Sequence, residues 1–90
     1  MEVELKVSAR FIEDSQQIYS KRIATALERA IQNITFMPTC GSKIVPLSLK
    51  NEFGEDIYKY LVGPFDLIYS YSSKQCIVEL HALIDQRRIY

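Results

Sequence analysis

Four polar residues in the C-terminal half of the chain have the right types for acid–base chemistry. His81 is the only histidine among the 90 residues, and Glu79 precedes it by two positions in the same predicted strand. Asp66 and Lys59 lie in the two strands predicted before it. A carboxylate beside a histidine orients the ring and favours its protonated form nearer to neutral pH. Such a pair could serve as a general acid and a general base.

The predicted turns determine which of these residues face one another, because hairpin turns set strand register. With two-residue turns at Gly63-Pro64 and Ser73-Lys74, Asp66 lies directly opposite His81. Opposite residues in a sheet have Cβ atoms about 5 Å apart, within reach of a carboxylate–imidazole hydrogen bond. We therefore expect Asp66 to raise the pKa of His81.

The same register places Lys59 and Glu79 on either side of Ile68, on the same face as Asp66. This arrangement predicts a small polar cluster. A solvated face with cross-strand ion pairs is the alternative interpretation, since the spacing requires no second catalytic group.

The other face of these strands is apolar and is expected to lie under helices. Every second residue is aromatic or aliphatic, the pattern of a half-buried strand. The residues expected to point toward the helices are Tyr58, Tyr60, Phe65, Leu67, Tyr69, Val78 and Leu80.

The remaining elements are predicted from the periodicity of apolar residues and from the positions of capping residues, glycine and proline. Residues 3–7 alternate apolar and charged side chains, which predicts a strand, and Ser8 is a suitable N-cap for the helical stretch that follows. That stretch contains no Gly or Pro up to Phe36, and we expect it to break near Ser20-Lys21 into a helical hairpin. Residues 44–49 are interpreted as a short edge strand because of Pro46.

The predicted fold class is α+β, in a single domain spanning residues 1–90. We expect an N-terminal strand, a two-helix hairpin and an antiparallel meander of three to four strands, with the helices on one face. The meander strands are expected at 57–62, 65–71 and 76–84.

Composition limits the possible partners. The chain has 11 basic and 11 acidic residues, so no net charge attracts it to nucleic acid or anionic lipid. Its first residues are charged and it has no apolar run near ~20 residues, so we expect neither a signal peptide nor a membrane span. Cys40 and Cys76 lack metal-binding spacing and are expected to be free thiols in a reducing cytosol. No cofactor is expected.

The chain resembles the RelE/ParE superfamily of bacterial toxins from type II toxin–antitoxin systems. The resemblance spans nearly all of the sequence and rests on four segments in order: VELKVS, the helical stretch that ends in MPTCG, LVGPFDLIYSY, and LIDQRRIY. In the third segment Val62, Gly63, Phe65, Leu67, Ile68 and Tyr69 match the family pattern. In the last, Leu83, Ile84, Arg87 and Arg88 match.

The resemblance implies a cytoplasmic bacterial protein that inhibits growth and is neutralised by a cognate antitoxin. RelE-like members cut messenger RNA on the ribosome, and ParE-like members bind DNA gyrase without cutting nucleic acid. RNA cleavage in this family uses basic residues on the open face of the sheet, a C-terminal arginine and often a terminal tyrosine. Lys59, Arg87 and Tyr90 stand at matching or nearby positions, with His81 as a possible proton-transfer group.

Two positions depart from the family pattern. Asp66 occupies the position where the pattern has arginine, and Leu61 another that is often basic. A carboxylate beside a scissile phosphate repels it. Three functions therefore remain open: a toxin that binds its target, an RNA endonuclease, and a catalytically silent relative that binds only an antitoxin-like partner. Arg87 and Arg88 also have a plain interpretation as solvated terminal residues.

Overall fold

A strand, three helices, three further strands and a short terminal helix follow one another along the chain. The computed structural model describes residues 3–89. No helix in that range is long and apolar enough to cross a membrane. The elements are β1 (Glu4–Val7), α1 (Ala9–Ser15), α2 (Lys21–Phe36), α3 (Leu47–Phe53), β2 (Ile57–Val62), β3 (Phe65–Ser72), β4 (Ile77–Asp85) and α4 (Gln86–Ile89).

The four strands form one mixed sheet in the order β1-β4-β3-β2. β1 pairs in parallel with β4, and the other neighbours are antiparallel. The predicted hairpin at Gly63-Pro64 is confirmed, with Tyr60 opposite Leu67. The α+β class is confirmed, including an antiparallel meander of β2, β3 and β4.

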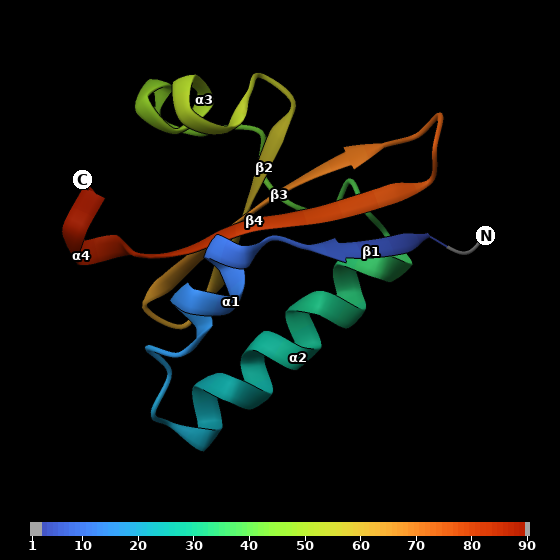
Figure 1. The fold of residues 1–90 in the computed structure, drawn as a ribbon. Coiled ribbons are helices and arrows are strands. Elements are labelled where there is room, and N and C mark those ends of the chain that lie inside the picture. The colour runs from blue at the N-terminus through green and yellow to red at the C-terminus, as the bar shows by residue number, and fades with distance from the viewer. Residues whose placement is uncertain (1–2, 90) are drawn as a thin grey trace.

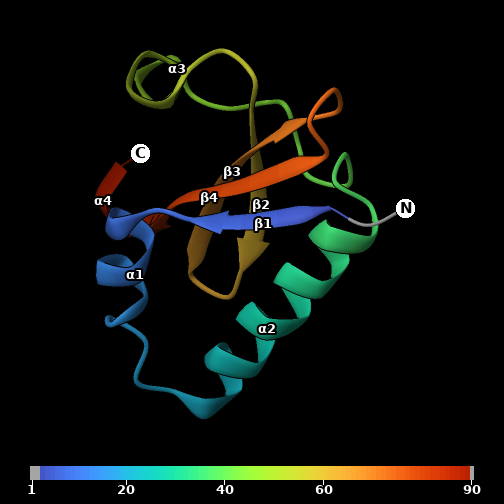
Figure 2. The ribbon, with the colours of Figure 1, turned by 45° about the vertical axis from the view of Figure 1, so that its right-hand side comes forward.

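Helices α1 and α2 cover the face of the sheet that was predicted to be apolar (Figures 1 and 2). Ser8 caps α1 and Ser20 caps α2, so the helical stretch breaks where the sequence predicted. Phe11 of α1 and Ile34 of α2 are buried against the strands. The predicted core residues are all on this face: Tyr58, Phe65, Leu67, Tyr69, Val78 and Leu80 are buried in the cluster and Tyr60 packs against it.

Helix α3 lies on the opposite face of the sheet (Figures 1 and 2). The strand predicted for residues 44–49 is wrong, because Pro46 precedes a helix instead. Proline is readily accommodated at a helix start, where its missing N–H has no helical partner. The helix buries Leu49 against Ile57 and Ile68, and Ile68 was expected on the face with the polar cluster.

Tyr69 holds the loop between α2 and α3 against the sheet. Its buried hydroxyl donates a hydrogen bond to the Pro38 carbonyl at 2.8 Å and accepts one from the Gly41 N–H at 2.9 Å. A Cβ on Gly41 would lie 2.5 Å from this hydroxyl oxygen, so glycine is required by the close approach. Burial raises the pKa of Tyr69 above its ordinary value. Ser42, the residue after Gly41, forms an isolated antiparallel bridge with Lys59 of β2.

Candidate functional site

His81 is the extra residue of a β-bulge in β4. In the pairing of β3 with β4, Tyr69 lies opposite Leu80 and Ile68 lies opposite Ala82, which leaves His81 without a residue opposite. A bulge of this kind redirects a side chain and bends the strand, and bulges are over-represented beside active sites. The ring of His81 therefore occupies a position that a regular strand would not give it.

The side chains of Ser8, the N-cap of α1, and of Asp14 bind the backbone of β4 at the bulge and just beyond it. The Ser8 hydroxyl donates a hydrogen bond to the His81 carbonyl at 2.9 Å, while its oxygen accepts one from the Phe11 N–H. Two residues beyond the bulge, the Leu83 N–H donates to the Asp14 carboxylate at 3.1 Å. Since buried backbone groups need partners, these contacts stabilise the irregular strand.

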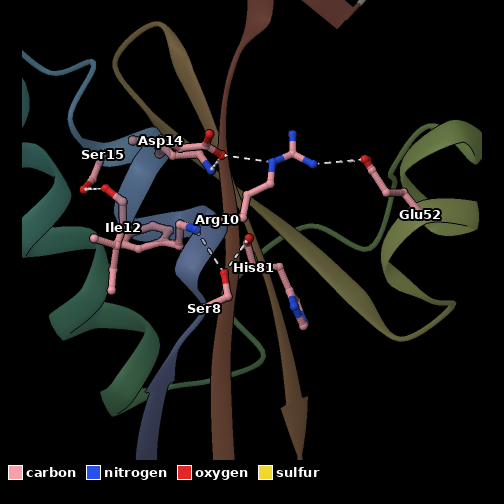
Figure 3. A network of polar contacts seen from close by, with 9 residues as sticks. Ser8, Arg10, Ile12, Asp14, Ser15, Glu52 and His81 are labelled. Atoms are coloured by element: carbon pink, nitrogen blue, oxygen red, sulfur yellow. Dashed lines mark hydrogen bonds and ion pairs between the residues drawn. The ribbon is translucent and has the colours of Figure 1, made fainter.

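Arg10 extends this network to α3 (Figure 3). Its guanidinium lies 3.4 Å from the Asp14 carboxylate and 3.1 Å from that of Glu52, and it also stacks over the ring of Phe53. In Figure 3 the His81 carbonyl faces Ser8, whereas the imidazole points away from the network. The network thus fixes the backbone of His81 and leaves its ring available to other groups.

The imidazole of His81 contacts Ser70 and Glu79. Its Nε2 lies 2.8 Å from the Ser70 hydroxyl oxygen, and its Nδ1 lies 3.9 Å from a Glu79 carboxylate oxygen. The ring centroid lies 5.7 Å from that of Phe53 at the end of α3. Burial lowers the pKa of His81, and the charge of Glu79 opposes this by raising it. The neutral imidazole is therefore favoured relative to a histidine in water.

The predicted pairing of Asp66 with His81 is wrong. Ser73 to Cys76 form a four-residue turn instead of a two-residue one, and the bulge adds one more residue. Asp66 consequently lies opposite Ile84, three positions beyond the expected partner. The aspartate is only 1% exposed, and its carboxylate accepts a hydrogen bond from Gln86 at 3.0 Å. The prediction that Asp66 raises the pKa of His81 is wrong for the same reason.

Among the described residues, the backbones of the predicted catalytic residues Lys59, His81 and Arg87 lie at separate positions in the fold. Lys59 lies opposite Ile68, which in turn lies opposite Ala82. Lys59 is therefore two strand spacings, roughly 10 Å, from the β4 backbone next to His81.

The C-terminal candidates lie at the other end of β4. Arg87 forms an ion pair with the buried carboxylate of Asp85 at 2.7 Å, and this partner raises the pKa of the guanidinium. Asp85 is four residues beyond His81, roughly 13 Å along a strand. The side chain of Arg88 and all of Tyr90 lie outside the described residues.

A groove runs between α2 and the edge strand β2, and we name it the α2–β2 groove. It has a volume of about 490 Å³, and a hollow of about 300 Å³ continues it past Asn33 and Tyr60. Both hollows are open to solvent along the helix. Their lining includes Arg22, Arg29, Phe36, Met37, Tyr60 and Leu61.

The α2–β2 groove combines apolar surface with positive charge. Phe36 is 87% exposed and Leu61 is 64% exposed, both high values for large apolar side chains. Arg22 and Arg29 form no ion pair with any described residue. Their seven-residue spacing puts them on one side of α2 and is visible in the sequence.

The backbone edge of β2 is open beside this groove. Ser42 pairs with the outward N–H and carbonyl of Lys59, so in an antiparallel strand the same groups of Leu61 also point outward. Within residues 3–89 these Leu61 groups have no backbone partner. Unpaired edges of this kind accept a strand from another chain.

Ser70 and Gln86 were missed by the sequence analysis. Both were missed because the predicted register placed every residue of β4 opposite the wrong residue of β3. No spacing signal marks either residue. Among residues 3–89, no group of three His, Cys, Asp or Glu side chains could hold a metal ion.

Comparison with solved structures identifies the fold. The chain is similar to the toxin–antitoxin complex RelBE2 from Mycobacterium tuberculosis, with a TM-score of 0.72, 12% identity, and coverage of 94% of this chain and 99% of that one. It is similar to the archaeal RelE–RelB complex from Pyrococcus horikoshii OT3, with a TM-score of 0.71, 15% identity, and coverage of 98% and 99%.

A third similar structure is a mutant of the Escherichia coli toxin RelE in the free state, with a TM-score of 0.66, 14% identity and full coverage of both chains. No family model and no curated protein matches the sequence. The resemblance to the RelE/ParE superfamily is thus confirmed at the level of the fold, which this chain shares with RelE toxins.

Proposed function

We propose that this protein is the toxin of a type II toxin–antitoxin pair, and that it inhibits growth by binding a cellular target. The observation that supports the toxin assignment is the fold, which matches RelE chains over nearly their whole length. Two of those chains were solved together with RelB partners.

The geometry of the sheet favours binding over RNA cleavage. The resemblance assigns RNA chemistry to the face of the sheet that α3 partly covers here, with Ile57, Ile68 and Ala82 buried beneath it. Asp66 is buried on this face and binds Gln86. The described contacts of Arg87 are with Asp85, and those of His81 are with Ser70, Glu79 and Phe53, so these two residues lie in separate places in the fold.

RNA cleavage remains the second candidate, and one observation favours it. The lowered pKa of His81 keeps its imidazole neutral near pH 7, as a general base for a 2′-hydroxyl must be. The third candidate, a silent relative that only binds a partner, differs from both in having no effect on growth.

Inducible expression in a bacterial host separates the three. Growth arrest with intact messenger RNA supports the proposal, and a DNA supercoiling readout then tests gyrase as the target. Growth arrest with messenger RNA cleavage that is lost in His81→Gln would instead support the endonuclease. Normal growth at a confirmed level of folded protein would contradict both toxin hypotheses.

We further propose that the α2–β2 groove binds the cognate antitoxin. Its apolar residues and its two arginines match an amphipathic segment with acidic side chains, and the open edge at Leu61 suits an added strand. A segment that folds on binding can wrap a large surface, so one partner can use both modes.

Charge reversal in the groove tests this proposal. Arg22→Glu combined with Arg29→Glu should weaken capture of the product of the adjacent gene at least tenfold, because the two introduced carboxylates would repel an acidic segment. Lys21→Glu is the matched control, since Lys21 is an exposed residue of the same helix that does not line the groove. Equal weakening by the control would show a general charge effect and contradict a site at the groove.

A further inference from the structure

The contacts of His81 resemble those of an activated serine nucleophile. Nε2 of His81 lies 2.8 Å from the Ser70 hydroxyl oxygen, within hydrogen-bond distance. On the other side of the ring, Nδ1 lies 3.9 Å from Glu79, a charge contact longer than a hydrogen bond. A nucleophile, a base within hydrogen-bond reach and a third group that orients the base is the general pattern of nucleophilic catalysis.

The fold holds this arrangement in place from two sides. Glu79 lies directly opposite Ser70 in the sheet, so regular pairing fixes two of the three backbones. The bulge places the third, because Ala82 takes the position opposite Ile68 and His81 is the extra residue between. The Ser8 hydroxyl then binds the His81 carbonyl at 2.9 Å.

The site is also open enough for a small reagent. The side chain of His81 is 17% exposed and that of Glu79 is 44% exposed. Ser70 is partly exposed near the hairpin end of β3, beyond the region where α3 buries Ile68. Ser70, His81 and Glu79 thus each keep some solvent-exposed surface.

We infer that Ser70, His81 and Glu79 form a nucleophilic site that reacts with esters carrying a small acyl group. This inference is independent of the toxin assignment. The charge of Glu79 favours the tautomer with the proton on Nδ1, which leaves Nε2 to accept the Ser70 proton.

The reaction has two steps, acylation of Ser70 and hydrolysis of the acyl-serine. In the first, the Ser70 hydroxyl loses its proton to His81 Nε2 and its oxygen forms a bond to the acyl carbon. The bond from that carbon to the ester oxygen breaks, and the leaving alkoxide or phenoxide takes the proton from His81. In the second, water attacks the acyl carbon while its proton passes to His81 Nε2. The bond from that carbon to the Ser70 oxygen then breaks, the oxygen takes the proton back from His81, and the carboxylic acid and free Ser70 are released.

The test uses p-nitrophenyl acetate and the full chain. We expect release of p-nitrophenolate and a single acetyl group, located on Ser70 by peptide mass spectrometry. Ser70→Ala should remove the acetylation, whereas Ser72→Ala should leave it unchanged. Ser72 is the matched control because it lies two residues along the same strand and no contact joins it to His81.

His81→Gln should slow the acetylation about 100-fold or more, the lower end of the range for a positioned general base. Added imidazole should restore part of the rate in His81→Ala, which a purely structural role of the ring would not allow. The wild-type rate should rise with pH through the lowered pKa of His81 and then level off, because only the neutral ring accepts the proton.

Glu79→Gln keeps an exposed side chain of the same size and should slow the reaction by a smaller factor. Acetylation of Ser70 that does not depend on His81, or equal acetylation of Ser70 and Ser72, would overturn the proposal. An unmodified Ser70 in folded protein would overturn it as well.

Discussion

The carboxylate of Asp66 accepts a hydrogen bond from the side-chain amide of Gln86, with 3.0 Å between Oδ1 and Nε2. The aspartate is almost fully buried, so its carboxylate needs polar partners inside the protein, and Gln86 supplies one of them. This contact joins β3 to the first residue of α4 and makes Asp66 a structural residue.

Asp66→Arg should therefore destabilise the fold by about 3 kcal/mol or more, because it buries an unpaired cation in place of a paired carboxylate. Urea unfolding followed by circular dichroism measures this change. Asp66→Asn keeps the shape and can still accept from Gln86, so its cost should be only about 1 kcal/mol. A well-folded Asp66→Arg that gained RNA cleavage would contradict the assignment of Asp66 as structural.

The second prediction concerns the pKa of His81 in the folded protein. It should lie below 6.5 in an NMR titration, because burial disfavours the imidazolium. Glu79→Gln should lower the pKa further, since it removes the charge that raises it. Asp66→Asn should leave it unchanged, given that the two residues are not opposite. A response to Asp66→Asn would restore the pairing that the structure excludes.

The lowered pKa of His81 also makes the stability of the fold depend on pH. The unfolded chain binds a proton at His81 more readily than the folded chain does, because the folded pKa is the lower one. The free energy of unfolding should therefore rise as the pH increases from the folded pKa to about 6.5, and then level off. His81→Gln should remove this rise in thermal unfolding measured between pH 5 and pH 8. If the free energy of unfolding of that variant still rose with pH in the same way, the rise would belong to groups other than His81.

The third prediction concerns the contact between the Tyr69 hydroxyl and Gly41, which should stabilise the fold. Tyr69→Phe leaves the Gly41 N–H and the Pro38 carbonyl without their buried partner, which should cost about 1–3 kcal/mol. Gly41→Ala should cost a similar amount, because its Cβ would lie 2.5 Å from the hydroxyl oxygen. The double variant lacks the hydroxyl that the Gly41→Ala methyl group would meet. Its loss of folding free energy should therefore be smaller than the sum of the losses in the two single variants. Strict additivity would show that Gly41 is needed for another reason.

The parts of the fold that depend on local pattern could be predicted from the sequence. Ser8 and Ser20 cap the N-termini of α1 and α2, and the apolar alternation of β2 and β3 fixes the buried face. The hairpin at Gly63-Pro64 has two turn residues, so its register followed directly.

The candidate site depended on features without a local signal. A two-residue turn and a four-residue turn both fit the sequence between Ser72 and Ile77, and nothing in the sequence marks the bulge at His81. Together they displaced Asp66 by three positions from its expected partner. Helix α3 was missed because Pro46, which immediately precedes it, suits a strand edge and a helix start equally.

The last prediction concerns α3 as a cover for one face of the sheet. Leu49 is buried against Ile57 and Ile68, whereas Leu47 of the same helix is 68% exposed. Leu49→Ala should therefore cost about 2–5 kcal/mol if α3 remains docked, as other buried leucine truncations do. Leu47→Ala is the matched control and should change stability by less than about 0.5 kcal/mol.

Hydrogen exchange distinguishes loss of the cover from loss of the whole fold. If α3 opens as a unit, Leu49→Ala should speed amide exchange in residues 47–53 while β3 and β4 stay protected. The sheet should hold because α1 and α2 pack on its other face. Messenger RNA cleavage that appeared only in this variant would show that α3 blocks a nuclease face, and would contradict the proposal that the protein acts by binding alone. Equal acceleration throughout the chain would mean that α3 and the sheet unfold together.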